Sequence, residues 1–236
     1  MQATSLVVHW PLVQHRAMEF EWDADKADLN WRNHGVAFEV ATLVFDDQFR
    51  IEDDDPEPSE YRQNVIGYVE GRLLFVVFTM RGDVCRIISA RLGDRKERRR
   101  YHEEPRDRRK PDNPGSCDMT DSKTVRYRRD PANPPKADWS RVDAMSEVER
   151  DAAAYADPDA QPLTDEQLAR MRRVPDVAAI RTKLGLSIEE FATRFGLSPI
   201  LVREWEEHRR ILDPAAKMLL RVIEREPEAV ARVAAE

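Results

Sequence analysis

Three short segments rich in apolar residues follow one another in the first half of the chain, the middle one almost unbroken, and polar or glycine-containing turns separate them. Runs of this length between turn residues are typical of strands, and their close succession predicts an antiparallel meander. Met18 to Trp22 alternates between apolar and polar residues and predicts an edge strand. The runs and turns are residues 61–69, Glu70-Gly71, 73–80, Arg81-Gly82-Asp83 and 84–91.

Helical patterns flank the meander. Asp23 has the side chain of an N-cap and Gly35 stands where a helix would end, so we expect a helix between them. A second helix is expected over residues 38–45. Asp94 followed by Glu97 is an acidic form of the capping box and predicts a third helix directly after the last strand. Helices packed on an antiparallel sheet form an α+β layer fold, here of about ninety residues.

The second half of the chain is predicted to be mainly helical. Residues 119–140 have the composition of an extended or weakly structured segment. Beyond them, a serine or threonine is repeatedly followed by glutamate or glutamine at the third position, which is the sequence of a capping box. These pairs are Ser146 with Glu149, Thr164 with Gln167, and Ser187 with Glu190.

Two of these helices are short and adjoin a tight turn. Ser187 begins the first, Gly196-Leu197 makes the turn, and Ser198-Pro199 begins the second. This arrangement is typical of the helix-turn-helix of DNA-binding proteins. An apolar segment at 219–223 predicts a further helix that closes this all-α domain or forms a dimer.

Composition narrows the function. The 236 residues carry a net charge of −7, which argues against a protein that coats nucleic acid, so any nucleic-acid site must be a local patch. The 2 cysteines make neither a disulfide framework nor a metal-ligand spacing, which fits a reducing cytoplasm. We expect no cofactor and no metal. No apolar run approaches the length of a membrane span, and residues 1–17 lack the features of a signal peptide.

These patterns divide the chain into five parts. A short extension, residues 1–17, precedes the α+β domain at 18–104. Residues 105–118 are rich in proline and charge, have no periodicity, and are predicted to be a linker. The segment 119–170 then leads to the all-α domain at 171–236.

A cationic stretch lies at the end of the last predicted strand. From Arg81 to Arg100 there are 8 basic residues and 3 acidic ones, a local balance of +5. Guanidinium groups at this density suit a phosphate-rich ligand, although a solvated helix face has the same composition. Arg86 and Arg91 point to opposite faces of a regular strand, unless a bulge or the strand end intervenes.

Residues 18–104 resemble the BrnT family of toxins, which have a RelE-like ribonuclease fold. The order and spacing of the matching residues hold over nearly the whole segment. They are Phe20-Glu21-Trp22-Asp23, Lys26, Asn30, His34-Gly35-Val36, Phe38, Arg86-Ile87-Ile88-Ser89-Ala90-Arg91, Glu97-Arg98 and Tyr101.

Residues 119–236 resemble the antitoxins that accompany such toxins, of the type that ends in an XRE-like helix-turn-helix. Toxin and antitoxin are ordinarily separate chains. The sequence departs from the antitoxin pattern at two places. Pro199-Ile200 replaces small or polar residues, and His208 replaces the usual glycine. The matching residues are Asp138-Trp139, Pro162-Leu163-Thr164-Asp165, Arg173-Val174-Pro175, Leu186-Ser187, Glu190-Phe191-Ala192, Phe195-Gly196-Leu197, Trp205-Glu206, Arg209-Arg210 and Pro214.

The first resemblance implies metal-independent RNA cleavage, in which a ribose 2′-hydroxyl attacks the adjacent phosphate. This reaction needs a base, cations for the charge that develops on the phosphate, and an acid for the leaving oxygen. RNA contacts are expected from Lys26, Arg95, Arg98 and Arg99. The expected catalytic residues are the cations Arg86, Arg91, Arg62 and Arg81, the phosphate-positioning Tyr101, and His34 as acid or base.

Three of these residues also have simpler structural interpretations. His34 can cap the carbonyls at the end of its helix. Tyr101 can be a core residue with a polar tip. Lys26 can pair with a neighbouring acid on the surface.

The second resemblance implies operator DNA as a partner. The phosphate backbone is the main expected target, and the aromatic residues of the two helices are expected in the core. The expected DNA-binding residues are Ser198, Arg203, Arg209 and Arg210.

Together the resemblances predict a toxin–antitoxin fusion. A flexible linker of the predicted length spans roughly 20 Å, which sets an effective concentration of order mM for the attached antitoxin. We expect residues 119–170, anchored by Trp139, to pack on the toxin domain in cis or in a swapped homodimer. They would neutralise its ribonuclease (mRNA interferase) activity, while the C-terminal domain represses transcription. The alternative is a DNA-binding repressor whose toxin-like domain is catalytically inactive.

Overall fold

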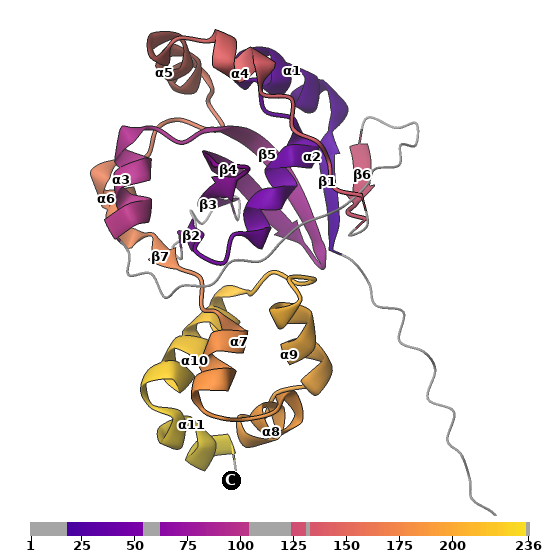
Figure 1. The fold of residues 1–236 in the computed structure, drawn as a ribbon, viewed down its shortest axis with the longest axis vertical. Helices are drawn as coiled ribbons and strands as arrows, with labels where there is room; N and C mark the ends of the chain where they lie inside the picture. Colours follow the sequence, from indigo (N-terminus) through magenta and orange to yellow (C-terminus); the bar gives the residue numbers. More distant parts are fainter. Residues whose placement is uncertain (1–17, 54–61, 104–123, 131–132, 235–236) are drawn as a thin grey trace, which may run out of the picture.

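The computed structural model describes residues 18–53, 62–103, 124–130 and 133–234. Figure 1 shows an α/β part built around one sheet and, below it, a bundle of helices that ends the chain. The predicted extension 1–17 and linker 105–118 lie outside the described residues. None of the helices within these ranges has the length and apolarity that a membrane crossing requires.

The strands and helices expected from the sequence occur in the expected order, and further short elements accompany them. The strands are β1 (Glu19–Asp23), β2 (Ile51–Glu52), β3 (Arg62–Val69), β4 (Arg72–Arg81), β5 (Val84–Leu92), β6 (Thr124–Arg128) and β7 (Arg172–Arg173). The first helices are α1 (Ala24–His34), α2 (Phe38–Ala41), the 3-10 helix η1 (Thr42–Asp46) and α3 (Arg95–Glu103). The remaining helices are α4 (Ser140–Ala144), α5 (Glu147–Ala156), α6 (Asp165–Arg170), α7 (Val177–Lys183), α8 (Ile188–Arg194), α9 (Pro199–Glu206), α10 (Pro214–Arg225) and α11 (Pro227–Ala234).

Local capping chemistry sets the helix boundaries. The Asp23 carboxylate accepts the Lys26 N–H at the start of α1, and Gly35 ends the helix in the left-handed conformation, at φ 66°. The predicted capping boxes of α5, α6 and α8 are present. Asp94 and Glu97 cap α3 reciprocally, with two bonds of 2.8 Å. The helix expected over residues 38–45 is instead a short α2 that tightens into η1.

The sheet has the strand order β6-β1-β5-β4-β3-β2-β7. The meander β3–β4–β5 is antiparallel as predicted. The expectation of a wholly antiparallel sheet is wrong, because β1 pairs with β5 in parallel. The chain passes through α1, α2 and the meander before β5 returns beside β1 in the same direction. Both edge strands come from the second half of the chain, so the sheet includes residues from 119–170 and 171–236.

A bulge in β5 determines which way its arginines face. Phe78 pairs with Ile87 and Val77 with Ser89, so Ile88 is an extra residue in β5. Arg86 is therefore opposite Thr79, and Arg91 is opposite Phe75. Paired residues of adjacent strands share a face, and Thr79 and Phe75 are an even number of residues apart on β4. The bulge thus brings the two arginines to one face of the sheet, which is one of the outcomes left open by the sequence.

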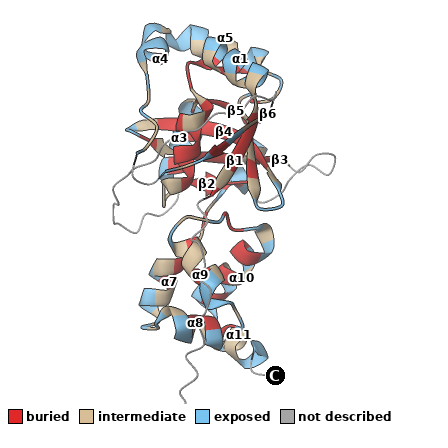
Figure 2. Ribbon diagram, turned by 90° about the vertical axis from the view of Figure 1, so that its right-hand side faces the viewer, coloured by how far each residue is buried: buried red, intermediate tan, exposed pale blue. Residues whose placement is uncertain are grey.

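The two faces of the sheet are covered unequally. Helices α1, α2 and η1 cover one face with a core that includes Phe20, Trp22 and Phe38. Helices α3 and α6 cover only one end of the other face, over a cluster that includes Phe75 and Tyr101. Figure 2 shows the resulting concentration of buried residues along the strands. The polar remainder of the second face is where the cationic residues gather.

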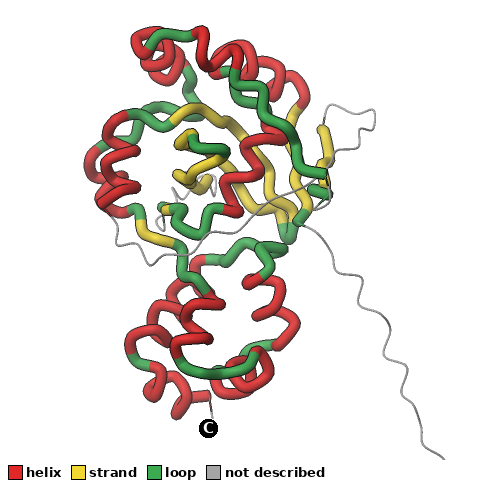
Figure 3. The backbone as a smooth tube through the Cα atoms, in the orientation of Figure 1, coloured by secondary structure: helices red, strands yellow, loops and turns green. Residues whose placement is uncertain are grey.

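The C-terminal helices form a bundle of their own. Phe191 and Trp205 are buried in its core, as expected. Helices α8 and α9 flank the turn at Gly196, and His208 follows α9 with φ 52°. That left-handed conformation is one that glycine adopts more readily than other residues do. Figure 3 shows the bundle below the sheet, connected to it through β7.

A buried ion pair also joins the bundle to the sheet. Lys217 of α10 is 1% exposed, and its ammonium contacts the carboxylate of Glu52, which is 0% exposed, in β2. Arg50 donates to the other oxygen of that carboxylate at 2.9 Å. Trp139, expected to anchor residues 119–170 on the first domain, lies at the β3–β4 turn, where its indole N–H donates to Glu70.

Candidate functional site

The site begins where the pairing between β1 and β5 stops. Beyond Arg86, β5 still pairs with β4 on one side, but on the side of β1 the strand pairing has ended and α1 lies along β5. Asn30 binds both backbone groups of Ala90: its Oδ1 accepts the N–H at 2.9 Å, and its Nδ2 donates to the carbonyl at 2.8 Å. The buried Asn30 side chain therefore replaces a strand and fixes α1 against β5.

One face of α1 is thereby turned toward the end of β5. Lys26, Asn30 and His34 follow one another at intervals of four residues, so they share a face of the helix. Ser89 of β5 lies next to this face, with its hydroxyl 3.0 Å from Asn30 Oδ1. Arg62 comes from the start of β3, on the same side of the sheet as Ser89. The fold thus gathers two cations, a histidine and a hydroxyl from three elements.

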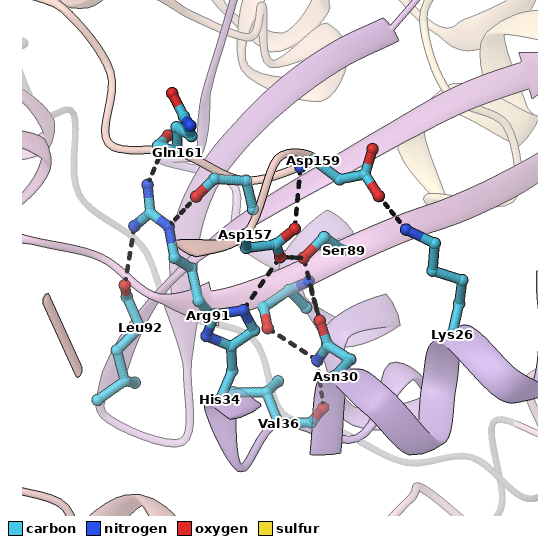
Figure 4. Close-up of polar contacts among 12 residues, drawn as sticks. Lys26, Asn30, His34, Val36, Ser89, Arg91, Leu92, Asp157, Asp159 and Gln161 are labelled. Carbon is cyan, nitrogen blue, oxygen red and sulfur yellow. Dashed lines mark hydrogen bonds and ion pairs between the residues drawn. The ribbon is translucent and has the colours of Figure 1, made fainter. Parts of the chain in front are cut away.

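Two carboxylates from the second half of the chain fill this site. Asp157 Oδ2 is 3.0 Å from His34 Nε2 and 2.7 Å from the Ser89 hydroxyl. Asp159 pairs with the Lys26 ammonium and accepts from Arg62 at 2.8 Å. Figure 4 shows the two acids side by side above β5, on the segment that follows α5.

Both acids are held in the ionised form. Burial alone would raise the pKa of Asp157, but hydrogen bonds from His34 and Ser89 outweigh it and hold that pKa well below its usual range. Burial likewise opposes ionisation of Asp159, and hydrogen bonds from Lys26 and Arg62 lower its pKa nevertheless. Each carboxylate is therefore a permanent anion at neutral pH.

The same segment continues onto Arg91. The guanidinium donates to the carbonyls of Ala160 at 2.6 Å and Gln161 at 3.1 Å. It also makes a two-pronged ion pair with Glu97, at 2.7 and 2.8 Å, and lies over the Phe75 ring. Arg91 is buried and its charge is balanced by Glu97, so it anchors the covering segment and closes the end of the sheet.

Arg86 and Arg81 occupy the open part of this face, away from the acidic segment. Both contact Glu21 Oε1 at 3.2 Å. Strand β6 adds Arg126 to the cluster, 3.7 Å from the other oxygen of Glu21. Arg81 and Arg126 have side chains that are 57% and 69% exposed, so this cationic surface is open to solvent. Arg126 had no signal in the sequence, because its place depends on the pairing of β6 with β1.

Tyr101 and the basic residues of α3 lie farther along the sheet. Tyr101 is buried and donates to Asp47 Oδ2 at 2.7 Å, which matches the core interpretation of this residue. Arg95 pairs with Glu147 at the start of α5, and Arg99 with Glu103 of its own helix. Arg98 is exposed. The described structure places none of these side chains against the His34 cluster.

The predicted DNA-binding residues are divided between two places. Ser198 is exposed at the start of α9, and Arg203 on the same helix pairs with Glu189 at 3.1 Å. Arg209 and Arg210 line a cavity of about 340 Å³ between the bundle and the sheet. Arg210 also contacts Asp83 of the β4–β5 turn at 2.9 Å. The last two arginines therefore face the α/β part of the chain.

Lys26, His34 and Arg62 were predicted as site residues from the sequence, whereas their carboxylate partners were not. The structure places His34 against Asp157 and Lys26 against Asp159, instead of a helix carbonyl or a neighbouring acid. The spacing of α1 contained a usable signal, because residues four apart share a helix face. Within the described residues, no three His, Cys, Asp or Glu side chains are grouped so as to hold a metal ion.

Comparison with known proteins gives a match within the α/β part of the chain. No curated protein matches the chain. The family model of BrnT, the ribonuclease toxin of type II toxin-antitoxin systems, matches residues 22–97, which run from β1 into α3. Over residues 22–97, the chain is therefore similar to this family of ribonuclease toxins.

Proposed function

We propose that the N-terminal domain is a metal-independent endoribonuclease and that the second half of the same chain neutralises it. In this reaction the ribose 2′-oxygen forms a bond to phosphorus and the bond from phosphorus to the 5′-oxygen breaks. The proton lost by the 2′-hydroxyl is balanced by one delivered to the 5′-oxygen. The observation that carries the proposal is the pair of carboxylates, Asp157 and Asp159, on the cationic site of a BrnT-family domain.

Each residue has a distinct proposed role. His34 is the proposed acid–base group, because imidazole most often has this role in catalysis, and the Ser89 hydroxyl contacts the same oxygen of Asp157. Lys26 and Arg62 stabilise phosphate charge. Arg81 and Arg86 lie on the open part of the sheet face, where they would guide the RNA chain. Tyr101 and the buried Arg91 support the end of the sheet, and we assign them no contact with the substrate.

The test of the ribonuclease is expression of residues 18–104 with and without residues 119–236. The fragment alone should arrest growth and fragment cellular RNA, and co-expression of the second half should restore both. His34→Ala in the fragment should abolish the damage, because the proposed acid–base group is lost. An intact RNA pool with the folded fragment would contradict the proposal.

The C-terminal bundle is proposed to bind operator DNA and repress transcription. The two short helices α8 and α9 around Gly196 support this assignment, and Arg203 on α9 is the proposed phosphate contact. A gel shift of the full chain on its own upstream DNA should weaken steeply with salt. Arg203→Ala should lower the slope of log K against log salt concentration by about 1, because one phosphate contact is lost. A shift that is absent, or insensitive to salt, would refute the assignment.

Repression is proposed to involve two copies of the chain. Helix α10 carries exposed Met218 and Val222, which are four residues apart and therefore share one face of the helix. Light scattering should give twice the chain mass, and Met218→Glu should halve it. An unchanged mass in the variant would contradict pairing through this helix.

The alternative function is a repressor with an inactive toxin-like domain. The observation that favours it is the permanent cover: the site is filled by residues of the same chain, several of them held in buried contacts. Under this alternative the fragment 18–104 is harmless, whereas the full chain still shifts operator DNA.

A further inference from the structure

We propose that residues 157–161 inhibit the site as a substrate mimic, with Asp157 and Asp159 in the places of two neighbouring phosphates of single-stranded RNA. The site then has two phosphate subsites. Lys26 and Arg62 form one, and His34 with Ser89 forms the other. The identity of the ligand as RNA rests on the proposed ribonuclease function, whereas the presence of two anion subsites rests on the contacts alone.

The chemistry of the contacts supports mimicry. Carboxylate and phosphate oxygens both accept charge-assisted hydrogen bonds from the same donors. Donors of α1, β3 and β5 converge on two anions that belong to one short segment. Two residues that are two positions apart span at most about 7 Å of extended chain, which is comparable with the backbone repeat of one nucleotide. Adjacent phosphates can therefore reach both subsites.

The segment is built to hold these two carboxylates in place. Asp157 Oδ1 accepts the backbone N–H of Asp159 at 2.9 Å, which fixes the loop at its start. Beyond Asp159, the buried Arg91 holds the next two carbonyls. The acid side chains themselves are only 14% and 13% exposed. An accidental surface ion pair would lack such support and would contribute little.

The two subsites differ in character, and this difference assigns the reacting phosphate. Lys26 and Arg62 are partly exposed, at 47% and 37%, and provide two fixed positive charges. His34 is 3% exposed and carries an imidazole, the side chain that most often serves as a general acid or base in catalysis. The geometry thus places the reacting phosphate at His34 and Ser89, and the neighbouring phosphate at Lys26 and Arg62.

Binding of a short 2′-O-methyl oligoribonucleotide to the full chain tests the mimicry without cleavage, because the attacking hydroxyl is blocked. The double variant D157N/D159N should bind this probe at least tenfold more tightly than the wild type, since each lost charged contact is worth roughly tenfold. Adding Arg62→Ala should cancel the gain. A probe with an uncharged methylphosphonate backbone should gain nothing.

Asp165→Asn is the matched control, because Asp165 also pairs with a lysine of the toxin domain, Lys96, but lies outside the proposed subsites. It should leave binding unchanged. If the double variant is poorly folded by circular dichroism, D159N alone should still tighten binding severalfold. Equal affinity of D159N, D165N and the wild type would overturn the mimicry.

Failure of this inference and failure of the proposed ribonuclease can be told apart. If the full chain carrying D157N/D159N cleaves RNA but gains no affinity for the uncleavable probe, the ribonuclease stands and the mimicry is overturned. If the double variant gains affinity and loses it again with Arg62→Ala, the mimicry is supported even when no RNA is cut.

Discussion

The buried pair of Lys217 and Glu52 makes a quantitative prediction about how the helical bundle is joined to the sheet. Burial alone would raise the pKa of Glu52, but Lys217 and Arg50 outweigh it and lower that pKa below its usual value. The carboxylate is therefore ionised and depends on its cations. Lys217→Met keeps the length of the side chain and removes one of these cations.

Breaking a buried pair by removing one partner costs about 3–5 kcal/mol. We expect a loss of about 3 kcal/mol in the free energy of unfolding, at the lower end of that range, because Arg50 still contacts Glu52. For a chain of this size that loss lowers Tm by roughly 6–12 °C. Urea unfolding followed by circular dichroism measures it, with Lys183→Met on the exposed side of α7 as control.

The pair also gives the variant a characteristic pH dependence. The pKa of Glu52 is lower in the folded chain than in the unfolded chain. The ionised carboxylate therefore adds to the free energy of unfolding at any pH above the unfolded pKa, and this stabilisation is lost as pH falls through the folded pKa. Lys217→Met should weaken that dependence, and Glu52→Gln in the same chain should recover part of the lost stability. A loss under about 1 kcal/mol, within the range of ordinary surface changes such as Lys183→Met, would refute the reasoning.

Three further outcomes follow from local contacts. Glu97→Gln removes the charge partner of buried Arg91, and thermal unfolding should register a loss of about 3 kcal/mol. Gly35→Ala places a Cβ against Val142 in a left-handed conformation, so chemical unfolding should detect a loss of about 1–2 kcal/mol or more. Since the pKa of Asp157 is lowered in the folded chain, its contribution to the free energy of unfolding is lost only as pH falls through that low pKa. Amide exchange should therefore find residues 157–161 still closed at about pH 4, near the ordinary aspartate pKa; opening at pH 5 would contradict the closed site.

The second half of the chain, whose residues 157–161 cover the site, is integrated into the fold and is not a loosely tethered inhibitor. Strand β6 extends the sheet beside β1, and β7 extends it beside β2. Tyr127 of β6 is buried in the same core as Phe20 and Trp22. Complete removal of the second half would therefore break sheet pairing and core packing at once. Opening of residues 157–161 alone requires fewer contacts to break and is the simpler route to an accessible site.

Features encoded within a few residues were predictable from the sequence. Asp23 and Gly35 bracket α1 as expected, and the serine and threonine capping boxes mark their helices. The turns at Glu70-Gly71 and Gly82 separate the strands of the meander at the predicted places. In each case the side chain bonds backbone groups only a few residues away, or the residue adopts the backbone conformation that the turn requires. Distant parts of the chain are therefore not needed to form the cap or the turn.

Features that depend on distant partners were not predictable. The parallel pairing of β1 with β5 joins Glu19 to Val84, and β6 returns to β1 from more than a hundred residues away. The bulge at Ile88 was one of several alternatives, and only the register against β4 decides it. The contacts of Asp157 with His34 and Ser89 depend on where α5 ends relative to α1, and no local sequence pattern predicts that position.

RNA cleavage by the full chain is the most direct test of a ribonuclease covered by its own carboxylates. Purified wild-type protein, D157N/D159N and D165N would be incubated with the same RNA in the presence of a metal chelator. We predict cleavage by D157N/D159N, little or none by the other two, and loss of the gained cleavage when His34→Ala is added. Equal cleavage by all three proteins, or none by D157N/D159N while the fragment 18–104 is active, would contradict it.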